Sequence, residues 1–398
     1  MNLKSILLGA AAAAAAATTA QAADLPVAPE PVDYVRVCDA FGTGFFYIPG
    51  TETCLRISGR VRADFYFNDF GDSNNSWDER SDNGTSTRAR GYIRLDARTN
   101  TEYGLVRAYV DTYMTVDSGS STGATLDKAF IQFGGFTVGR TTSFYDYYTG
   151  SAFNRMSQVF SDQTTWVAAY TAAFGNGISA TLSVEDGTNR SVNSLSGTAT
   201  AAVNSRTAFG TTLNVANGGH RMPDVVANLR VDQGWGSAQI MGAVHEARLV
   251  DTASKNKVGY AVGAGVTFKL PMIAAKDSIT FQANYADGAI AYTGFSGVGA
   301  DALYDGSTTK TAKAWSVSGG LTHYWTSQFS SSLDASYGKL DMPFGVRDLT
   351  QWNVAGNLVW EPVSGLLFGG ELEYQNRDYK GGTSKDSVVG MFRVQRSF

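Results

Sequence analysis

The chain has 398 residues, of which 32 are basic and 36 acidic, so its formal net charge is −4, and 43% of its residues are hydrophobic. A mean hydropathy of −0.14 excludes a bundle of membrane-spanning helices, and without a basic excess the composition gives no indication of nucleic-acid binding. The length suits two or three ordinary domains or one large barrel, so it does not decide the fold class.

The N-terminus has the pattern of a secretory signal peptide. An apolar run from Ile6 to Ala17 follows Lys4 and precedes Ala20-Gln21-Ala22, a small-x-small cleavage pattern. We therefore expect residues 1–22 to be removed, which leaves 31 basic and 36 acidic residues. The alternative, an N-terminal membrane anchor, fits less well because a spanning helix needs roughly 20 apolar residues.

Residues 23–54 form an N-terminal segment with a Pro-rich start. Its two cysteines, Cys38 and Cys54, are the only cysteines of the chain. Because exported proteins pass through an oxidising compartment, we expect a disulfide, worth on the order of 3 kcal/mol for a loop this short. A free thiol pair or a metal site is less consistent with the sequence, since no histidine lies nearby.

An alternation of apolar and polar residues begins at Leu55 and is clearest over residues 88–98. One face of this segment is charged or aromatic, with Arg88, Arg90, Tyr92, Arg94, Asp96 and Arg98. The other face carries small or apolar residues. Successive side chains of a strand point to opposite faces, so the pattern predicts a strand that separates an apolar medium from an aqueous one.

The same period of two predicts sixteen strands. They cover residues 55–68, 88–98, 103–114, 125–134, 136–140, 164–173, 177–186, 222–232, 236–249, 257–270, 277–289, 311–325, 328–340, 349–361, 365–379 and 385–398. Short turns alternate with longer loops between them, as in an up-and-down barrel inserted into a membrane from one side. Because lipid leaves no backbone group unpaired, the sheet must close. We therefore predict an all-β, antiparallel transmembrane barrel of the outer membrane, within a single domain of residues 23–398.

Two of the longer loops attract attention. Residues 141–163, the third long loop, hold many aromatic residues without a period of two, and a loop of this length is usually functional or disordered. Its aromatic content argues against disorder. Residues 187–221 are rich in Ser, Thr and Ala, and we expect them to form an exposed, solvated loop.

The residues from Tyr34 to Gly59 read Tyr-Val-Arg-Val-Cys-Asp-Ala-Phe-Gly-Thr-Gly-Phe-Phe-Tyr-Ile-Pro-Gly-Thr-Glu-Thr-Cys-Leu-Arg-Ile-Ser-Gly. This stretch resembles the start of the mature porins of alphaproteobacteria of the Rhizobiales type. The first five residues and the terminal Arg-Val-Gln-Arg-Ser-Phe398 are similar too, and Phe398 suits an outer-membrane assembly signal. The resemblance implies a trimeric, 16-stranded general porin whose third long loop folds into the channel.

If that loop enters the lumen, it brings three charged residues, Asp146, Arg155 and Asp162. Five arginines of the wall lie at strand positions whose side chains are expected to point into the lumen: Arg60, Arg62, Arg94, Arg98 and Arg107. Cations on one side and carboxylates on the other would set a transverse field that favours small polar solutes. Alternatively, some of these arginines pair with Asp64, Asp96 or Asp111 in cross-strand ladders.

We interpret the chain as an outer-membrane porin for passive diffusion of small hydrophilic solutes and ions. We expect a homotrimer in contact with outer-membrane lipid and lipopolysaccharide, with no cofactor, no bound metal, no nucleic-acid partner and no enzymatic activity. The alternative is a substrate-selective channel of the same fold, for example for sugars, with a solute site among the residues from Tyr145 to Phe160.

Two other classes of protein remain open. An outer-membrane enzyme would need one of three scattered histidines, His220, His245 or His323, beside a serine and an orienting acid. A soluble secreted sandwich would share the alternation of the strands but would be soluble without detergent.

Overall fold

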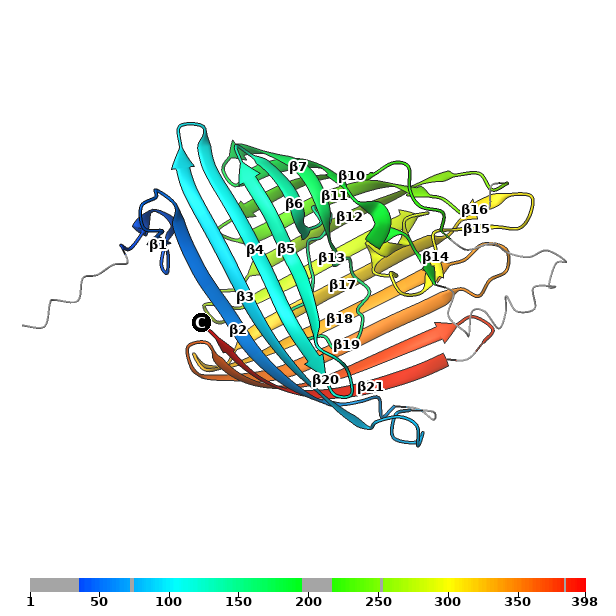
Figure 1. Cartoon of the computed structure of the whole chain (residues 1–398). Coiled ribbons are helices and arrows are strands. Elements are labelled where there is room, and N and C mark those ends of the chain that lie inside the picture. Colours follow the sequence, from blue (N-terminus) through cyan, green and yellow to red (C-terminus); the bar gives the residue numbers. More distant parts are fainter. Residues whose placement is uncertain (1–35, 72–74, 195–216, 251–252, 383) are drawn as a thin grey trace, which may run out of the picture.

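The alternating sequence forms sixteen long antiparallel strands in a closed barrel in the computed structural model, which describes residues 36–71, 75–194, 217–250, 253–382 and 384–398 (Figure 1). The strands are β2 (Cys54–Phe67), β3 (Thr85–Thr101), β4 (Gly104–Asp117), β5 (Gly123–Phe133), β6 (Phe136–Thr142), β7 (Thr164–Gly175), β8 (Ile178–Glu185), β10 (Asp224–Gln233), β11 (Gly236–Ala247), β12 (Lys257–Lys269), β13 (Ser278–Asp287), β17 (Lys313–Tyr324), β18 (Phe329–Asp341), β19 (Leu349–Val363), β20 (Leu366–Tyr379) and β21 (Ser384–Ser397). The predicted fold class is confirmed. The proposed signal peptide, residues 1–22, lies outside the described residues.

The barrel closes between its first and last long strands. Each strand pairs with its neighbours in the chain, and β2 also pairs with β21, where Phe65 lies opposite Phe392. The backbone groups of Gly59 and Phe398 exchange hydrogen bonds of 2.9 and 3.0 Å at the end of this seam. Closure leaves no unpaired sheet edge, which is the condition for a sheet that faces lipid.

The two faces of the sheet differ as the alternation predicts. On β3, Ile93 and Leu95 point outward and are 49% and 38% exposed, whereas Tyr92 and Asp96 point inward and are buried. Strands β3 and β4 each continue three residues beyond the C-terminal end predicted for them, to Thr101 and Asp117. Backbone pairing continues there past the apolar band, so the hydrophobic pattern alone underestimates their length. Among the described residues, no helix is long and apolar enough to cross a membrane.

The two rims of the barrel are built differently. One rim has short turns and carries the C-terminus and β1 (Phe46–Tyr47), whereas the other has the longer loops with β14 (Gly299–Ala300), β15 (Ala302–Tyr304) and β16 (Thr309–Thr311) (Figure 1). In an outer-membrane barrel the long loops face the outside of the cell and the short turns face the periplasm.

The predicted disulfide is confirmed at the short-turn rim. Cys38 and Cys54 are bonded, with their Cα atoms 6.0 Å apart, and both are buried. The short segment between them contains η2 (Asp39–Phe41) and β1, and its Phe45 ring packs against the guanidinium groups of Arg56 and Arg98 at 5.0 and 4.9 Å. The segment is thereby attached to the lumenal side of the first strands.

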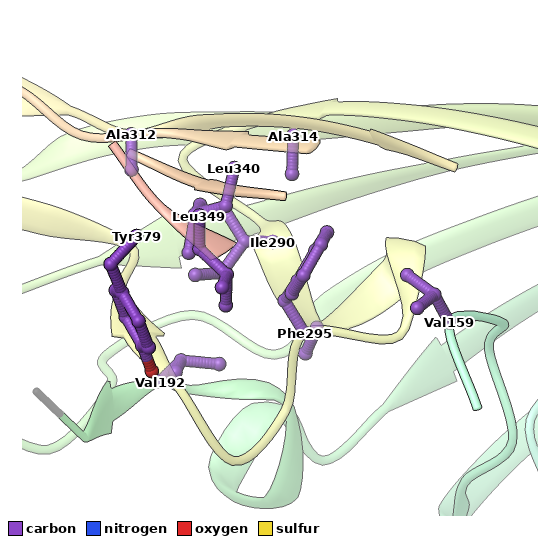
Figure 2. Packing of buried hydrophobic residues seen from close by; sticks show 10 residues of the cluster. Val159, Val192, Ile290, Phe295, Ala312, Ala314, Leu340, Leu349 and Tyr379 are labelled. Carbon is purple, nitrogen blue, oxygen red and sulfur yellow. The ribbon is translucent and has the colours of Figure 1, made fainter. Parts of the chain in front are cut away.

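At the long-loop rim, several loops pack together inside the barrel mouth. The fourth loop (residues 186–223) contains η3 (Gly187–Arg190) and β9 (Asn193–Ser194), and the sixth loop (residues 288–312) contains η4 (Ile290–Thr293). Figure 2 shows their apolar side chains: Val192, Ile290 and Phe295 lie with Val159, Leu340 and Leu349 in one buried cluster. The prediction of an exposed fourth loop is wrong for Arg190 and Val192, each 2% exposed, because β9 pairs with β14 of the sixth loop. Residues 195–216 of that loop lie outside the described residues.

Candidate functional site at the lumenal loop

The third long loop, residues 143–163, crosses the inside of the barrel, and we call it the lumenal loop. Three buried carboxylates on β18 and β20 accept its backbone N–H groups. Asp334 accepts from Ser151 and Ala152 at 2.8–3.0 Å, Glu371 accepts from Phe153 at 2.6 Å, and Glu373 accepts from Met156 at 2.8 Å and from Arg155. The loop is therefore held against strands about 180 to 220 residues away in the chain.

Tyrosines fix the first limb of this loop to the wall. The Tyr145 hydroxyl donates to Asn284 at 3.3 Å, and the Tyr147 hydroxyl donates to the Ser237 carbonyl at 2.8 Å. Glycines make room for these rings. A Cβ atom on Gly265 would lie 2.2 Å from the Tyr147 ring, and one on Gly320 would overlap the Tyr148 hydroxyl. Nothing in the local sequence distinguishes these glycines from others in the strands.

Opposite the docked limbs, the lumenal faces of β2, β3 and β4 carry most of the channel's arginines, and we call this surface the arginine wall. Four of the five arginines singled out from the sequence pair with aspartates. Arg62 lies 3.0 Å from Asp64, Arg94 lies 2.7 Å from Asp111, and Arg98 and Arg107 each lie 2.8 Å from Asp96. Two of these pairs, Arg94 with Asp111 and Arg107 with Asp96, join β3 to β4, so the cross-strand pairing that the sequence left open is present on the lumenal face itself.

Arg60 and Arg90 differ from these four. The Arg60 guanidinium lies 3.9 Å from the centre of the Tyr92 ring, and Arg90 donates to Thr115 at 2.7 Å and to the Tyr92 hydroxyl at 3.1 Å. Neither of them forms an ion pair with a carboxylate in the described part of the chain. Both arginines therefore keep an unneutralised charge at the lumenal surface.

The arginine wall as a whole is positive. Its described residues include eight arginines, namely Arg56, Arg60, Arg62, Arg88, Arg90, Arg94, Arg98 and Arg107. They include four carboxylates, namely Asp64, Asp96, Asp111 and Asp117. The carboxylates are also shared, since Asp64 accepts a further arginine, Arg393 of β21, at 2.7 Å.

The three charged loop residues have different surroundings. Arg155 is exposed, and its guanidinium lies 4.6 Å from the centre of the Tyr66 ring on the wall. Asp162 is exposed as well. The side chain of Asp146 is fully buried and lies 2.8 Å from Arg190, which corrects the expectation that its carboxylate faces the channel. Its charge is already neutralised inside the protein.

Sequence reasoning missed the residues that hold the loop. Asp334, Glu371 and Glu373 alternate with apolar residues, as ordinary inward positions of a strand do, and Arg190 lies in a segment that reads as a solvated loop. Their contacts join parts of the chain that only the closed barrel brings together, so no local motif could have identified them.

The barrel is closed, polar and charged side chains line its lumen, and a loop folds into it. These features define an outer-membrane channel. Residues 24–395 match the family model described as "Porin subfamily". Porin Omp2b of Brucella suis biovar 1 is 32% identical and porin Omp2b of Brucella abortus strain 2308 is 33% identical, each with both chains covered completely. The chain therefore belongs to this porin family, as its resemblance to Rhizobiales-type porins predicted.

Solved structures show the same fold. The outer membrane channel DcaP of Acinetobacter baumannii superposes with a TM-score of 0.70 at 17% identity, over 88% of this chain and 99% of that one. The anion-selective porin from Comamonas acidovorans gives 0.51 at 9% identity, over 87% and 100%. At these identities the likeness concerns the fold alone. Together with the family match, this likeness of fold supports an outer-membrane channel for passive diffusion rather than an enzyme. It does not favour the substrate-selective alternative.

Proposed function

We propose that this porin passes small hydrophilic solutes through a constriction between the lumenal loop and the arginine wall, and that it prefers anions. Arg60, Arg62, Arg94, Arg98 and Arg107 line this passage on the wall, and Arg155 and Asp162 line it on the loop. The observation that carries the proposal is the unequal charge of the wall, with eight arginines against four aspartates.

Local charge, rather than the charge of the whole chain, sets the selectivity of a narrow pore. The chain has a net charge of −4, but the loop carboxylate at Asp146 is neutralised by Arg190, and the three acids on β18 and β20 are covered by loop backbone. A passing ion therefore meets an excess of guanidinium groups. The transverse field expected from the sequence is correspondingly weak on its negative side.

The test is the reversal potential in a planar bilayer under a KCl gradient. We expect chloride to be more permeant than potassium. Changing Arg60→Gln together with Arg90→Gln removes two of four uncompensated charges, so the permeability ratio should fall by about half on a logarithmic scale. The matched control, Arg94→Gln with Asp111→Asn, removes one charge of each sign and should leave the ratio unchanged. A cation-selective wild-type channel contradicts the anion preference.

We further propose a homotrimer in the outer membrane, in contact with lipid and lipopolysaccharide. One similar structure, OmpT of Vibrio cholerae, is described as a trimer form, and trimers should give conductance steps in threes. We also propose that Phe398, which is 68% exposed beside the closing seam, acts as an assembly signal. Phe398→Ala should then lower the amount of folded barrel in the outer membrane.

We propose structural rather than catalytic roles for the histidines in the barrel wall. His245 Nδ1 lies 2.7 Å from Asp224 and His323 Nδ1 lies 2.6 Å from Asp277, so each is one half of a buried or half-buried pair. Hydrolysis of lipid or peptide by purified protein, lost on changing either histidine, would contradict this proposal.

A further inference from the structure

A fully buried arginine outside the strands joins the two limbs of the lumenal loop. Arg190, at the end of η3 in the fourth loop, donates from Nη2 to Asp146 at 2.8 Å and from Nη1 to the Ser161 hydroxyl at 2.7 Å. Asp146 lies near the start of the lumenal loop and Ser161 near its end. Asp146 also accepts the backbone N–H of Gln163 at 2.6 Å. One guanidinium group thus holds the base of the loop together.

The sixth loop supports this arginine from the other side. The Arg190 guanidinium lies 4.2 Å from the centre of the Tyr292 ring, and that ring packs edge-on against Tyr145 of the lumenal loop at 4.7 Å. The Tyr292 hydroxyl donates to Asp224 of β10 at 2.6 Å. The ring therefore connects the arginine to the barrel wall.

The network continues through the wall to the fourth and sixth loops. Asp224 lies 2.7 Å from His245 Nδ1, and His245 Nε2 lies 3.8 Å from Asp301 of the sixth loop. Asp301 accepts backbone N–H groups of Val192 and Ile290, at 2.6 and 2.9 Å. Six members have side chains that are 2% exposed or less, namely Asp146, Arg190, Asp224, His245, Tyr292 and Asp301.

We propose that Arg190 is a positioning residue for the constriction, because it sets the place of the lumenal loop through this buried network. A charge taken out of water is tolerated when it is paired, and removal of its partner leaves it uncompensated. Without Arg190, the Asp146 carboxylate would regain solvation most easily by moving toward the water of the lumen. The strands need not separate for this, since their pairing does not involve the loop.

This predicts a change in the channel without loss of the barrel. Single-channel currents of Arg190→Gln should show open-channel noise several-fold above that of the wild type, with additional conductance levels. Arg190→Lys should give an intermediate result, since an ammonium group can reach only one partner well. The electrophoretic mobility of the folded barrel and its resistance to heat should both stay unchanged. A purely structural role of Arg190 in barrel stability would not predict this result.

The control is Arg248→Gln, which removes the same charge from an arginine near the long-loop rim that donates to the Gly219 carbonyl and takes no part in this network. Its currents should match the wild type. Asp146→Asn with Arg190→Gln replaces the ion pair by a neutral one, so its noise should lie between those of the wild type and Arg190→Gln.

Two outcomes overturn the proposal. One is a steady, wild-type current from folded Arg190→Gln protein. If Arg190→Gln yields no folded barrel, the Asp146→Asn, Arg190→Gln double variant is measured in its place. The second outcome that overturns the proposal is a current from this double variant that cannot be distinguished from that of the wild type. Selectivity plays no part in these measurements, so a failed anion preference leaves this test intact.

Discussion

At the scale of single residues, the lumen is organised by what each charge is paired with. Arg94 and Arg98 carry carboxylate partners, whereas Arg60 rests on the Tyr92 ring, although all three share one parity in the sequence. Asp146 and Asp162 are both acids of the same loop, yet one is buried with Arg190 and the other is exposed. Residue type and position in the alternating pattern therefore indicate which side chains face the lumen. They do not indicate which of those charges lack a neutralising partner.

Asp162 should make the selectivity of the channel depend on pH. Although the residue is exposed, loss of water around its carboxyl group and the nearby Asp146 carboxylate raise the pKa of Asp162 to about 6. Between pH 7 and pH 5 this carboxyl takes up a proton, so the lumen loses one negative charge. The preference for anions should increase over this interval, with a midpoint near pH 6.

Reversal potentials measured from pH 5 to pH 8 check this dependence. Asp162→Asn is neutral throughout, so it should behave at pH 7 as the wild type does at pH 5 and should lack the transition. An identical transition in Asp162→Asn would assign the effect to another group.

At the scale of elements, the lumenal loop is held by side chains that accept its backbone. Asp334 alone accepts from the N–H groups of Ser151 and Ala152 and from the Asn154 side chain at 2.6 Å. A loop without regular secondary structure offers few acceptors for its own backbone N–H groups. Buried carboxylates of the strands accept these hydrogen bonds instead. The glycines beneath the tyrosines complete the docking surface.

Asp334→Ala should loosen the middle of this loop. The change leaves the N–H groups of Ser151 and Ala152 without their acceptor, which costs on the order of 2 kcal/mol of loop docking. Because the barrel pairing is unaffected, we expect folded channels with a broader distribution of single-channel conductance. Asp334→Asn retains one acceptor oxygen and should be intermediate. A narrow, wild-type distribution for Asp334→Ala would show that the tyrosine contacts suffice.

At the scale of the whole molecule, the closed ladder rather than any core provides the framework. Sixteen strands, each bonded to two neighbours, hold the wall, while the apolar cluster of Figure 2 joins loop residues to the strand ends at one mouth. The disulfide segment lies at the opposite end, near β1 in Figure 1. Changes at either end should therefore leave the barrel intact.

Cys38→Ser with Cys54→Ser tests this independence. Loss of a disulfide between residues 16 apart removes about 3 kcal/mol of loop constraint, so the segment of residues 36–54 should exchange its amide hydrogens faster. Conductance and heat-resistant mobility should remain those of the wild type. A barrel that no longer resists heat would mean that the segment takes part in closure.

The sequence by itself determined the wall of this protein. The period of two, the alternation of short and long connections and the two cysteines predicted the sixteen strands, their wet and lipid-facing sides and the disulfide. These features are encoded locally, because each strand must present one face to lipid and the other to water whatever its neighbours are.

Only the tertiary structure decided what lies inside the wall. The ion pair of Asp146 with Arg190, the carboxylates under the lumenal loop and the shared aspartates of the arginine wall join residues from separate strands and loops. Which charges are neutralised depends on distances across a closed barrel, and an alternating pattern carries no information about partners on the opposite side. The free charge in the channel therefore follows from the fold.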